Sequence, residues 1–236
     1  GLPAVIKTRR FGYDGKGQAF VADAGQAAES FAALGGGGVI VEGFVAFERE
    51  ISVIVARGRD GAAICYEPVW NIHKNHILAR TVAPAGIPAE VAAAAIAIAS
   101  RIAEKLDYVG VMGVEMFLSV EVDGPRLFVN ELAPRVHNSG HWTLDACVVS
   151  QFEQHVRAIC GWPLGTVERH SDAVMNNLLG EAVHDWQRWA RQPETAVHIY
   201  GKVGAAPGRK MGHVTRLYPK GERPDPGLAG SMRPLD

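Results

Sequence analysis

A dense run of polar side chains follows a β-like segment near the middle of the chain. Residues 134–141 read Pro-Arg-Val-His-Asn-Ser-Gly-His, directly after Phe-Val-Asn-Glu-Leu-Ala. Side chains of this kind would surround a small, planar, charged species, and they are Arg135, His137, Asn138 and Ser139. The alternative is a helix N-cap at Asn138 or Ser139 with incidental polar neighbours. Both can hold, because a helix N-terminus is itself an anion site.

Two carboxylates lie among apolar residues on the two arms of an expected hairpin. Glu115 stands in Val-Met-Gly-Val-Glu-Met-Phe, and Glu131 follows Asn130 in Phe-Val-Asn-Glu-Leu. A buried carboxylate without a partner is costly. Together with Asn130 the two acids form an oxygen ligand set that suits Mg²⁺ shared with phosphates. The alternative is that both acids point outward from a half-exposed strand, but their apolar neighbours favour the metal.

The turn of this hairpin decides whether the two acids can share a metal. Side chains alternate faces along a strand, and a one-residue slip moves a residue to the other face. A three-residue loop at residues 122–124 would place Glu115 directly across from Glu131. We therefore predict an odd-length loop, or an odd number of bulges between the acids, with both carboxylates pointing into one cleft.

A glycine-rich loop separates the first two expected strands. It consists of Gly12, Tyr13, Asp14, Gly15, Lys16, Gly17 and Gln18. Exposed backbone N–H groups and one ammonium suit a lid over a polyphosphate, whereas three glycines and an aspartate equally suit a plain hairpin turn. The loop is not a P-loop, because no Lys-Ser/Thr pair and no helix follow its last glycine. The pattern leaves lid and turn open.

Other polar residues become candidates for ligand binding only when they are considered together with the motifs above. Lys7 lies within an apolar strand, where an isolated lysine usually faces water. A very hydrophobic strand ends in Glu42, Gly43, Phe44 and Val45, with Glu50 eight residues after Glu42. Backbone groups at such a strand end can read a purine edge and a carboxylate can bind ribose hydroxyls, although surface acids are the simpler interpretation.

Basic turns occur near the end of the chain. They carry Lys202, Arg209 and Lys210, in His-Ile-Tyr-Gly-Lys and Pro-Gly-Arg-Lys-Met-Gly-His. Basic turns are common, but Gly-Arg-Lys-Met-Gly is tight enough to indicate a phosphate cradle.

The composition is that of an ordinary globular protein. Of 236 residues, 47% are hydrophobic and 21% are charged, which is enough to build a substantial core. The formal net charge of −1 gives no overall attraction to nucleic acid or to an anionic membrane, so we expect neither as a partner. Three cysteines without a C-x-x-C pair indicate no disulfide framework and fit a reducing cytoplasm.

The elements that would position these residues predict an α+β fold with mainly antiparallel strands. We expect strands over residues 4–9, 19–22, 39–42, 51–56 and 62–67, a hairpin over 109–122 and 126–132, and strands at 174–179, 197–200 and 213–218. Helices are expected at 25–34, 89–106, 144–159 and 186–190. The predicted domains are a partial lid subdomain (1–60), a core subdomain (61–165), a small β-rich C-terminal domain (166–219) and a flexible tail (220–236).

Taken together, these motifs resemble the ATP-grasp superfamily and, within it, the family of N5-carboxyaminoimidazole ribonucleotide synthetases. The resemblance covers residues 1 to about 218. It rests on Lys-Thr-Arg-Arg with the glycine-rich loop, on Glu-Gly-Phe-Val, on the run from Asn130 to Thr143, on Ser-Gln-Phe-Glu-Gln-His at 150–155, and on the two basic turns.

The resemblance implies a role for each candidate. ATP would lie between two subdomains, with Lys7 and the loop Gly12–Gln18 on its phosphates, Glu42–Val45 on the adenine, Glu50 on the ribose and His73 nearby. Glu115, Asn130 and Glu131 would hold Mg²⁺. Arg135, His137, Asn138 and Ser139 would embrace bicarbonate, and Lys202 and Arg209 would hold the 5′-phosphate of aminoimidazole ribonucleotide. The resemblance also implies a cytoplasmic homodimer.

The sequence departs from the family pattern at its start. It opens without methionine, almost directly in a strand, and lacks both the family's N-terminal domain and the basic ATP-contacting residue before Lys7. We therefore expect a fragment of a longer protein, and the sequence leaves open whether the chain alone is active. Two alternatives are another ATP-grasp carboxylase, which should lack the Arg-Val-His-Asn-Ser-Gly-His run and the second basic turn, and a catalytically silent nucleotide-binding or dimerisation module.

Overall fold

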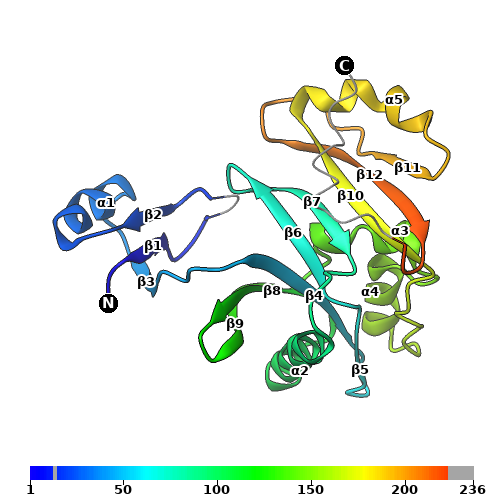
Figure 1. The fold of residues 1–236 in the computed structure, drawn as a ribbon, viewed down its shortest axis with the longest axis horizontal. Helices are drawn as coiled ribbons and strands as arrows, with labels where there is room; N and C mark the ends of the chain where they lie inside the picture. Colours follow the sequence, from blue (N-terminus) through cyan, green and yellow to red (C-terminus); the bar gives the residue numbers. More distant parts are fainter. Residues whose placement is uncertain (13–14, 223–236) are drawn as a thin grey trace. The chain divides into compact units, whose positions relative to one another are not determined.

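The computed structural model describes residues 1–12 and 15–222. Tyr13 and Asp14 of the predicted lid, and most of the predicted tail, lie outside these residues. The described chain forms two compact units (Figure 1). The smaller unit is Gly1–Phe47 with His73–Ile77, and the larger unit is Glu48–Ile72 with the described residues from Leu78 onward. The predicted α+β class is confirmed.

The smaller unit is built on a three-stranded antiparallel sheet. Its strands β1 (Ala4–Thr8), β2 (Gln18–Val21) and β3 (Val39–Gly43) lie in the order β2-β1-β3. A short 3-10 turn, η1 (Ala24–Gln26), leads into helix α1 (Ala27–Ala33), and the Asp23 carboxylate caps that turn by accepting from the backbone N–H groups of Gly25 and Gln26. These elements follow the sequence prediction closely.

The larger unit contains a nine-stranded sheet. The order is β11-β12-β10-β7-β6-β4-β8-β9, with β5 paired to β4. The strands are β4 (Arg49–Arg57), β5 (Ala63–Cys65), β6 (Val69–Lys74), β7 (Ile77–Ala83), β8 (Gly110–Glu121), β9 (Gly124–Ala133), β10 (Ser171–Leu179), β11 (Thr195–Ile199) and β12 (Lys210–Pro219). Strand β10 pairs with β7, so the strands of the predicted C-terminal domain continue the same sheet. The predicted domain boundaries stay a prediction.

Odd-numbered and even-numbered residues of β4 point to opposite faces of this sheet. Ile51, Val53 and Val55 pack under helix α2 (Ala89–Lys105), together with its alanines and the methionines of β8. Ile54 and Ala56 point to the opposite face and pack against Trp142 and its neighbours. Because both faces are covered, β4 is apolar along nearly its whole length. The even-numbered residues of β4 therefore point to the face that carries Trp142.

The second long helix predicted for residues 144–159 is wrong. The structure has a single turn, α3 (Thr143–Ala146), and a separate helix α4 (Gln151–Cys160). Cys147 between them is extended and bridges to Arg169, a partner 22 residues away that local periodicity does not reveal. Ser150 then begins α4, because its side chain accepts from the backbone N–H of Glu153. Gly161, with φ 71°, ends the helix as expected.

The sequence analysis also missed the hairpin of β6 and β7. Asn75 and His76 form its turn with φ angles of 50° and 64°, a conformation that asparagine tolerates better than most residues. Near the C-terminus, a 3-10 segment η3 (Gly180–Asp185) precedes helix α5 (Trp186–Ala190), which matches its prediction. A further 3-10 turn, η2 (Asn138–Gly140), lies within the polar run.

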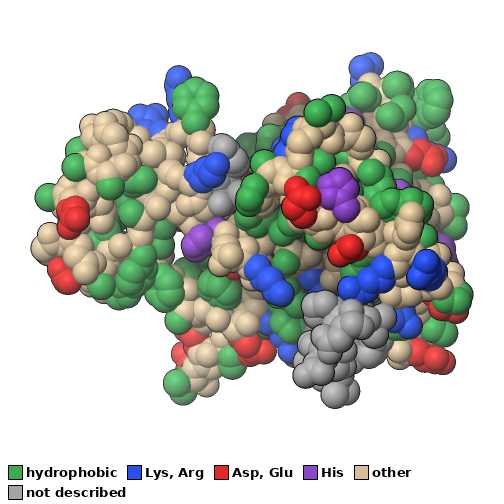
Figure 2. All heavy atoms as spheres, turned by 90° about the horizontal axis from the view of Figure 1, so that it is seen from above, with side chains coloured by type: hydrophobic (Ala, Val, Ile, Leu, Met, Phe, Trp, Pro, Cys, Tyr) green, Lys and Arg blue, Asp and Glu red, His purple; other side chains and the backbone are tan. Residues whose placement is uncertain are grey.

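The surface shows a mixture of side-chain types. On the face drawn in Figure 2, basic and acidic side chains of the described residues are interspersed with apolar and neutral ones. This distribution accords with the formal net charge of −1. Among the described residues, no helix is both long and apolar enough to cross a membrane.

Candidate active site

The two acids of the β8–β9 hairpin lie directly opposite each other. The register pairs Glu115 with Glu131, as predicted, and of the two predicted routes to this register the structure has the odd number of bulges and not the odd-length loop. The hairpin closes through a two-residue loop, since Glu121 pairs with Gly124, and a single register shift follows between Glu115 and Met116. This shift leaves Asn130 as the extra residue, so one bulge provides the odd displacement. Directly paired residues share a face, and Asn130 stands beside both acids.

Glu115 also faces the polar centre of the larger unit. Its neighbour on the other side is Ser52 of β4, and the Glu115 side chain is 17% exposed. Gly113, two residues earlier on the same face, lies under His137: an added Cβ would stand 2.8 Å from the His137 Cβ. Glycine is therefore required here for the polar run to approach the strand. Its consequence is that Nε2 of His137 lies 3.7 Å from a carboxylate oxygen of Glu115.

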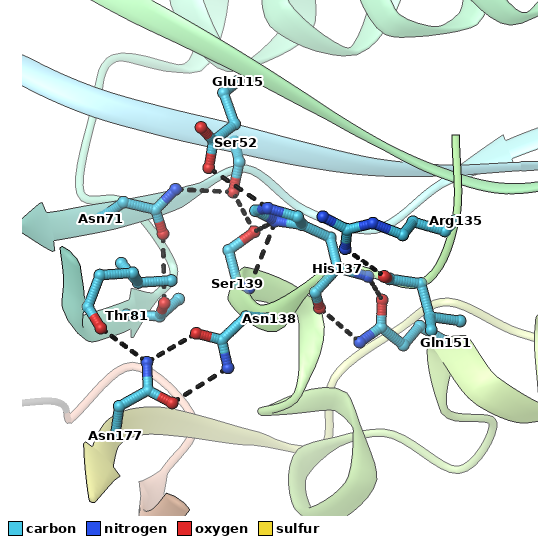
Figure 3. A network of polar contacts seen from close by, with 12 residues as sticks. Ser52, Asn71, Thr81, Glu115, Arg135, His137, Asn138, Ser139, Gln151 and Asn177 are labelled. Carbon is cyan, nitrogen blue, oxygen red and sulfur yellow. Dashed lines mark hydrogen bonds and ion pairs between the residues drawn. The ribbon is translucent and has the colours of Figure 1, made fainter. Parts of the chain in front are cut away.

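The imidazole of His137 is held from its other side by hydroxyl groups (Figure 3). Its Nδ1 lies 2.8 Å from the Ser139 hydroxyl, which in turn accepts a 2.7 Å hydrogen bond from the Ser52 hydroxyl. Ser139 and Ser52 are both fully buried. Ser139 therefore holds His137 in this structure, and its predicted contact with bicarbonate stays a prediction.

The backbone of His137 is clamped by the first residue of α4. Gln151 is fully buried; its amide nitrogen donates to the His137 carbonyl (2.7 Å), and its amide oxygen accepts from the His137 N–H (3.0 Å). The same amide nitrogen lies 2.9 Å from Nδ1 of His141. The clamp fixes the start of the polar run to the helix.

The other two residues predicted to bind bicarbonate differ in how their side chains are hydrogen-bonded. Asn138 forms a reciprocal amide pair with Asn177 of β10, at 3.0 and 2.6 Å, and Asn177 also donates to the Leu78 carbonyl. Arg135 is exposed, and its guanidinium donates to the carbonyl of Val136 (3.0 Å). The polar run is thus a rigid turn from which Arg135 and the Nε2 edge of His137 extend.

In the smaller unit, the structure joins two residues that the sequence analysis kept apart. Lys7 on β1 forms a 2.6 Å ion pair with Glu42 on β3, its diagonal neighbour in the sheet. A hollow of about 520 Å³ beside Lys7 is lined by Lys7, Thr8, Arg9, Val39 and Ile40. Lys7 is therefore a positioned cation at the edge of a hollow and not an isolated surface lysine.

The glycine-rich loop connects β1 and β2 where it was expected. The Thr8 N–H donates to the Gly17 carbonyl (2.7 Å), and Gly15 (φ 77°) packs so tightly on His76 that a Cβ would stand 2.4 Å from it. The described part of the loop thus contacts the β6–β7 turn of the same unit, which also contains His73. Whether the loop acts as a lid stays a prediction.

The remaining nucleotide candidates lie on both units. Gly43 ends β3, and Phe44 donates from its N–H to the Pro3 carbonyl (3.1 Å) while its ring packs edge-on against Phe20. Val45 follows in the same segment. Glu50 belongs to the larger unit and, as an even-numbered residue of β4, lies on the face of the sheet that carries Ser52.

The basic turn near the C-terminus has internal contacts of its own. Arg209 donates to the carbonyls of Val203 (2.5 Å) and Gly204 (2.9 Å), and Lys202 donates to the Lys210 carbonyl (2.8 Å). Both side chains therefore shape the loop between β11 and β12. Their predicted contact with a phosphate stays a prediction.

A histidine cluster lies behind the polar run. Asp145 accepts from Nε2 of His198 (3.0 Å), which raises the pKa of His198, whereas burial lowers the pKa of His213 to about 3 and that of His141 to about 4. The rings of His198 and His213 are stacked, with 16° between their planes. An imidazole binds metal in its own plane, so two stacked rings are poorly arranged to share an ion.

Comparison with known protein families identifies the family of this chain. Residues 1–152 match the ATP-grasp domain. The chain belongs to the ATP-grasp family. Residues 173–223 match a second family, the phosphoribosylaminoimidazole carboxylase C-terminal domain. Both matches agree with the resemblance inferred from the motifs.

Within the ATP-grasp family, the chain is similar to proteins that share one name. The chain is 50% identical to N5-carboxyaminoimidazole ribonucleotide synthase of Brucella melitensis, over 92% of this chain and 59% of the relative. It resembles the ADP complex of an N5-carboxyaminoimidazole ribonucleotide synthetase (43% identity, TM-score 0.85, 92% and 57% of the two chains). It also resembles the Aspergillus clavatus enzyme in complex with ADP and 5-aminoimidazole ribonucleotide (30%, 0.84, 93% and 58%). The chain thus spans less than two thirds of these relatives.

Three residues of this ATP-grasp chain were missed as parts of the site. Ser52 and Asn71 are buried and hydrogen-bonded to each other (2.9 Å), and Gln151 clamps His137. A serine within the apolar run Ile-Ser-Val-Ile-Val-Ala was a usable signal, because a buried hydroxyl needs a partner. Its partner is 87 residues away, so the sequence did not identify it.

Proposed function

We propose that the protein carrying this chain uses ATP to carboxylate 5-aminoimidazole ribonucleotide with bicarbonate, in de novo purine biosynthesis. The products are N5-carboxyaminoimidazole ribonucleotide, ADP and phosphate, formed through carboxyphosphate. The observation that carries the proposal is the Glu115–Glu131 pair beside His137, in an ATP-grasp chain whose relatives are named for this product. The ADP and 5-aminoimidazole ribonucleotide complexes of those relatives support it.

The nucleotide would be bound by the candidates named from the sequence. Lys7 and the glycine-rich loop would contact the phosphates, Glu42–Val45 the adenine, and Glu50 the ribose, with His73 nearby. The donor chemistry beside the paired acids suits a hard cation, because two carboxylates and an amide supply oxygen ligands. Glu115, Glu131 and Asn130 would hold Mg²⁺, which would neutralise charge on the triphosphate.

Bicarbonate would bind at the exposed edge of the polar run. Arg135 supplies a cation, and the Nε2 edge of His137 supplies a second polar group beside Glu115. Asn138, Ser139 and Gln151 would act one step back, by keeping this edge rigid. Phosphoryl transfer depends mainly on positioning and on charge stabilisation, so a clamped turn is well suited to orient bicarbonate. An acyl phosphate intermediate also requires that water be excluded.

The second substrate would be held by the basic turn. Lys202 and Arg209 would bind the 5′-phosphate of 5-aminoimidazole ribonucleotide through charge-assisted hydrogen bonds. We further propose that the protein is a homodimer and works in the cytoplasm, as the resemblance implies.

The test is an ADP-release assay on the protein that carries this chain. With Mg·ATP present, we expect ADP release to require both bicarbonate and 5-aminoimidazole ribonucleotide, and the N-carboxylated ribonucleotide to appear in equal amount. ADP release that ignores the ribonucleotide, in protein that binds Mg·ATP normally, would contradict the proposal.

A further inference from the structure

A buried chain of hydrogen bonds leads from the sheet to His137 (Figure 3). It begins on β7, where the Thr81 hydroxyl donates to the amide oxygen of Asn71 (3.1 Å). The amide nitrogen of Asn71 donates to the Ser52 hydroxyl (2.9 Å), and Ser52 donates to the Ser139 hydroxyl (2.7 Å). Ser139 lies 2.8 Å from Nδ1 of His137. The side chains that link the sheet to His137 are each at most 3% exposed, and they are Thr81, Asn71, Ser52 and Ser139.

This chain of hydrogen bonds has a direction. An amide nitrogen can only donate, so Ser52 receives a hydrogen bond from Asn71 and directs its own proton to Ser139. Ser139 receives in turn, and its single hydroxyl proton is directed to Nδ1 of His137. The order of donors is therefore set at Asn71 and is transmitted to the imidazole through two hydroxyl groups.

The backbone at the other end favours the same direction. The N–H of Ser139 also points at Nδ1 of His137, at 3.4 Å, as part of the cap of the η2 turn. A backbone N–H cannot accept, so this long contact also favours an unprotonated Nδ1, more weakly than the 2.8 Å contact with the Ser139 hydroxyl. The hydrogen-bonded side chains of Thr81, Asn71, Ser52 and Ser139 are called the relay below. The relay and the backbone cap thus favour the same tautomer, although they approach the ring from different elements.

We propose that Asn71 and Ser52 are positioning residues that hold His137 as its Nε2–H tautomer. The proton then lies on the nitrogen that is 3.7 Å from Glu115. His137 consequently presents an N–H donor at this edge, facing the Glu115 carboxylate at 3.7 Å and directed to an oxygen of a bound anionic substrate. It does not act there as a proton acceptor. The substrate part of this inference rests on the proposed function, whereas the tautomer itself does not.

The burial of the relay explains why it can determine the tautomer. In water, the two tautomers of an imidazole exchange freely because solvent can donate to or accept from either nitrogen. Ser52, Ser139 and Thr81 have no exposed surface, so a reversed chain would leave the Asn71 amide nitrogen directed at a hydroxyl proton. An unsatisfied buried polar group is costly, on the order of 1–3 kcal/mol. The sheet thereby selects one protonation pattern at the site.

The test is to reverse the relay with an isosteric change. Asn71→Asp replaces a donor by an acceptor, so Ser52 should donate to Asp, Ser139 to Ser52, and His137 from Nδ1 to Ser139. Ring ¹⁵N shifts, recorded by long-range ¹H–¹⁵N correlation at about pH 8 on the chain itself, distinguish the two tautomers. The His137 signal among the nine histidines is assigned by its loss in His137→Gln.

We expect the Nε2–H pattern in the unmodified chain and the Nδ1–H pattern in Asn71→Asp. Thr81→Val is the matched control, since it changes a buried side chain of the same network without reversing it, and should keep the Nε2–H pattern. An Nδ1–H pattern in the unmodified chain would overturn the proposal. So would an Asn71→Asp chain that is folded and keeps the original pattern.

A second variant covers the case in which the buried aspartate prevents folding. Ser52→Ala breaks the relay without adding charge, and frees the Ser139 hydroxyl either to donate to Nδ1 or to accept from it. We expect a mixture of tautomers, and an unchanged Nε2–H pattern would remove Asn71 and Ser52 from the positioning role. Because these measurements need no substrate, they succeed or fail independently of the proposed carboxylation.

Discussion

Glu115 on β8 is paired directly with Glu131 on β9, and the ladder slips by one residue immediately beside this pair. The slip matters because the two-residue turn at the end of the hairpin would otherwise leave the acids on opposite faces. The extra residue is Asn130, which is itself a potential oxygen ligand. A single irregularity of the backbone thus brings together the groups that we propose for Mg²⁺.

Neutralising one of these acids should remove the reaction without removing the fold. Glu131→Gln keeps the size of the side chain and deletes one negative charge, so Mg·ATP turnover should be abolished in the protein that carries this chain. Glu121→Gln, on the same hairpin but paired with Arg126, is the matched control and should retain turnover. Near-normal turnover of Glu131→Gln at ordinary Mg²⁺ concentrations would exclude Glu131 as a ligand, and circular dichroism checks folding.

Removing the guanidinium of the basic turn should affect one substrate far more than the other. Arg209→Ala should raise the KM for 5-aminoimidazole ribonucleotide about tenfold or more, since a hydrogen bond to a charged group contributes about 1.5–3 kcal/mol. The KM for ATP should change little. Arg191→Ala, an exposed arginine before β11, serves as the control. A larger rise in the KM for ATP than in the KM for 5-aminoimidazole ribonucleotide would show that Arg209 does not bind the ribonucleotide phosphate.

Filling the space under His137 should destabilise the larger unit. Gly113→Ala places a methyl group 2.8 Å from the His137 Cβ, so the polar run must shift, at a cost of about 1–3 kcal/mol. Gly37→Ala meets no atom within 4 Å and should change the unfolding free energy much less. Urea unfolding of the two variants measures the difference. Equal stabilities would show that the turn adapts without strain.

Acid should destabilise the chain through its buried histidines. Burial lowers the pKa of His213 to about 3 and that of His141 to about 4, so both stay neutral in the folded chain at pH 5. The unfolded chain binds protons below about pH 6.5, which favours unfolding by on the order of 2 kcal/mol for each histidine at pH 5. His198, whose pKa is raised by Asp145, has the opposite effect: its contribution is present in acid and declines as pH rises through its folded pKa.

The measurement is the urea midpoint as a function of pH. Between pH 7 and pH 5 the free energy of unfolding should fall, and it should fall less in His213→Asn, which removes one of the two neutral buried rings. His184→Asn changes an exposed histidine and should leave the slope as it is. A slope that His213→Asn does not reduce would place the acid sensitivity elsewhere.

Local patterns predicted most elements but few of the contacts between them. The apolar run of β4, the alanine-rich helix α2 and the β8–β9 hairpin follow from periodicity and turn residues alone. The division between α3 and α4 was missed, because it depends on the bridge from Cys147 to Arg169, which belongs to tertiary structure. Periodicity cannot report a partner that lies far along the chain.

The same limit applies to the site. Glu115, Glu131 and the polar run were singled out because polar residues among apolar neighbours were expected to be buried and to require partners. Glu115 is largely buried, but Glu131 is exposed, so this expectation was wrong for Glu131. The ion pair of Lys7 with Glu42 and the relay through Ser52 and Asn71 depend on which strands are neighbours, and the sequence analysis did not include β6 at all. Sequence reasoning therefore identified the residues that extend from the site better than the residues that hold them.

The alternation of β4 has a consequence for how this strand can vary in evolution. Its odd-numbered residues fill the space under α2, where another apolar residue of similar volume is an acceptable replacement. Its even-numbered residues include Ser52, which has no apolar substitute in the relay. Substitution tolerance should thus follow residue parity, with neighbouring positions under unrelated constraints. A one-residue insertion or deletion within β4 would exchange the two sets of constraints at once.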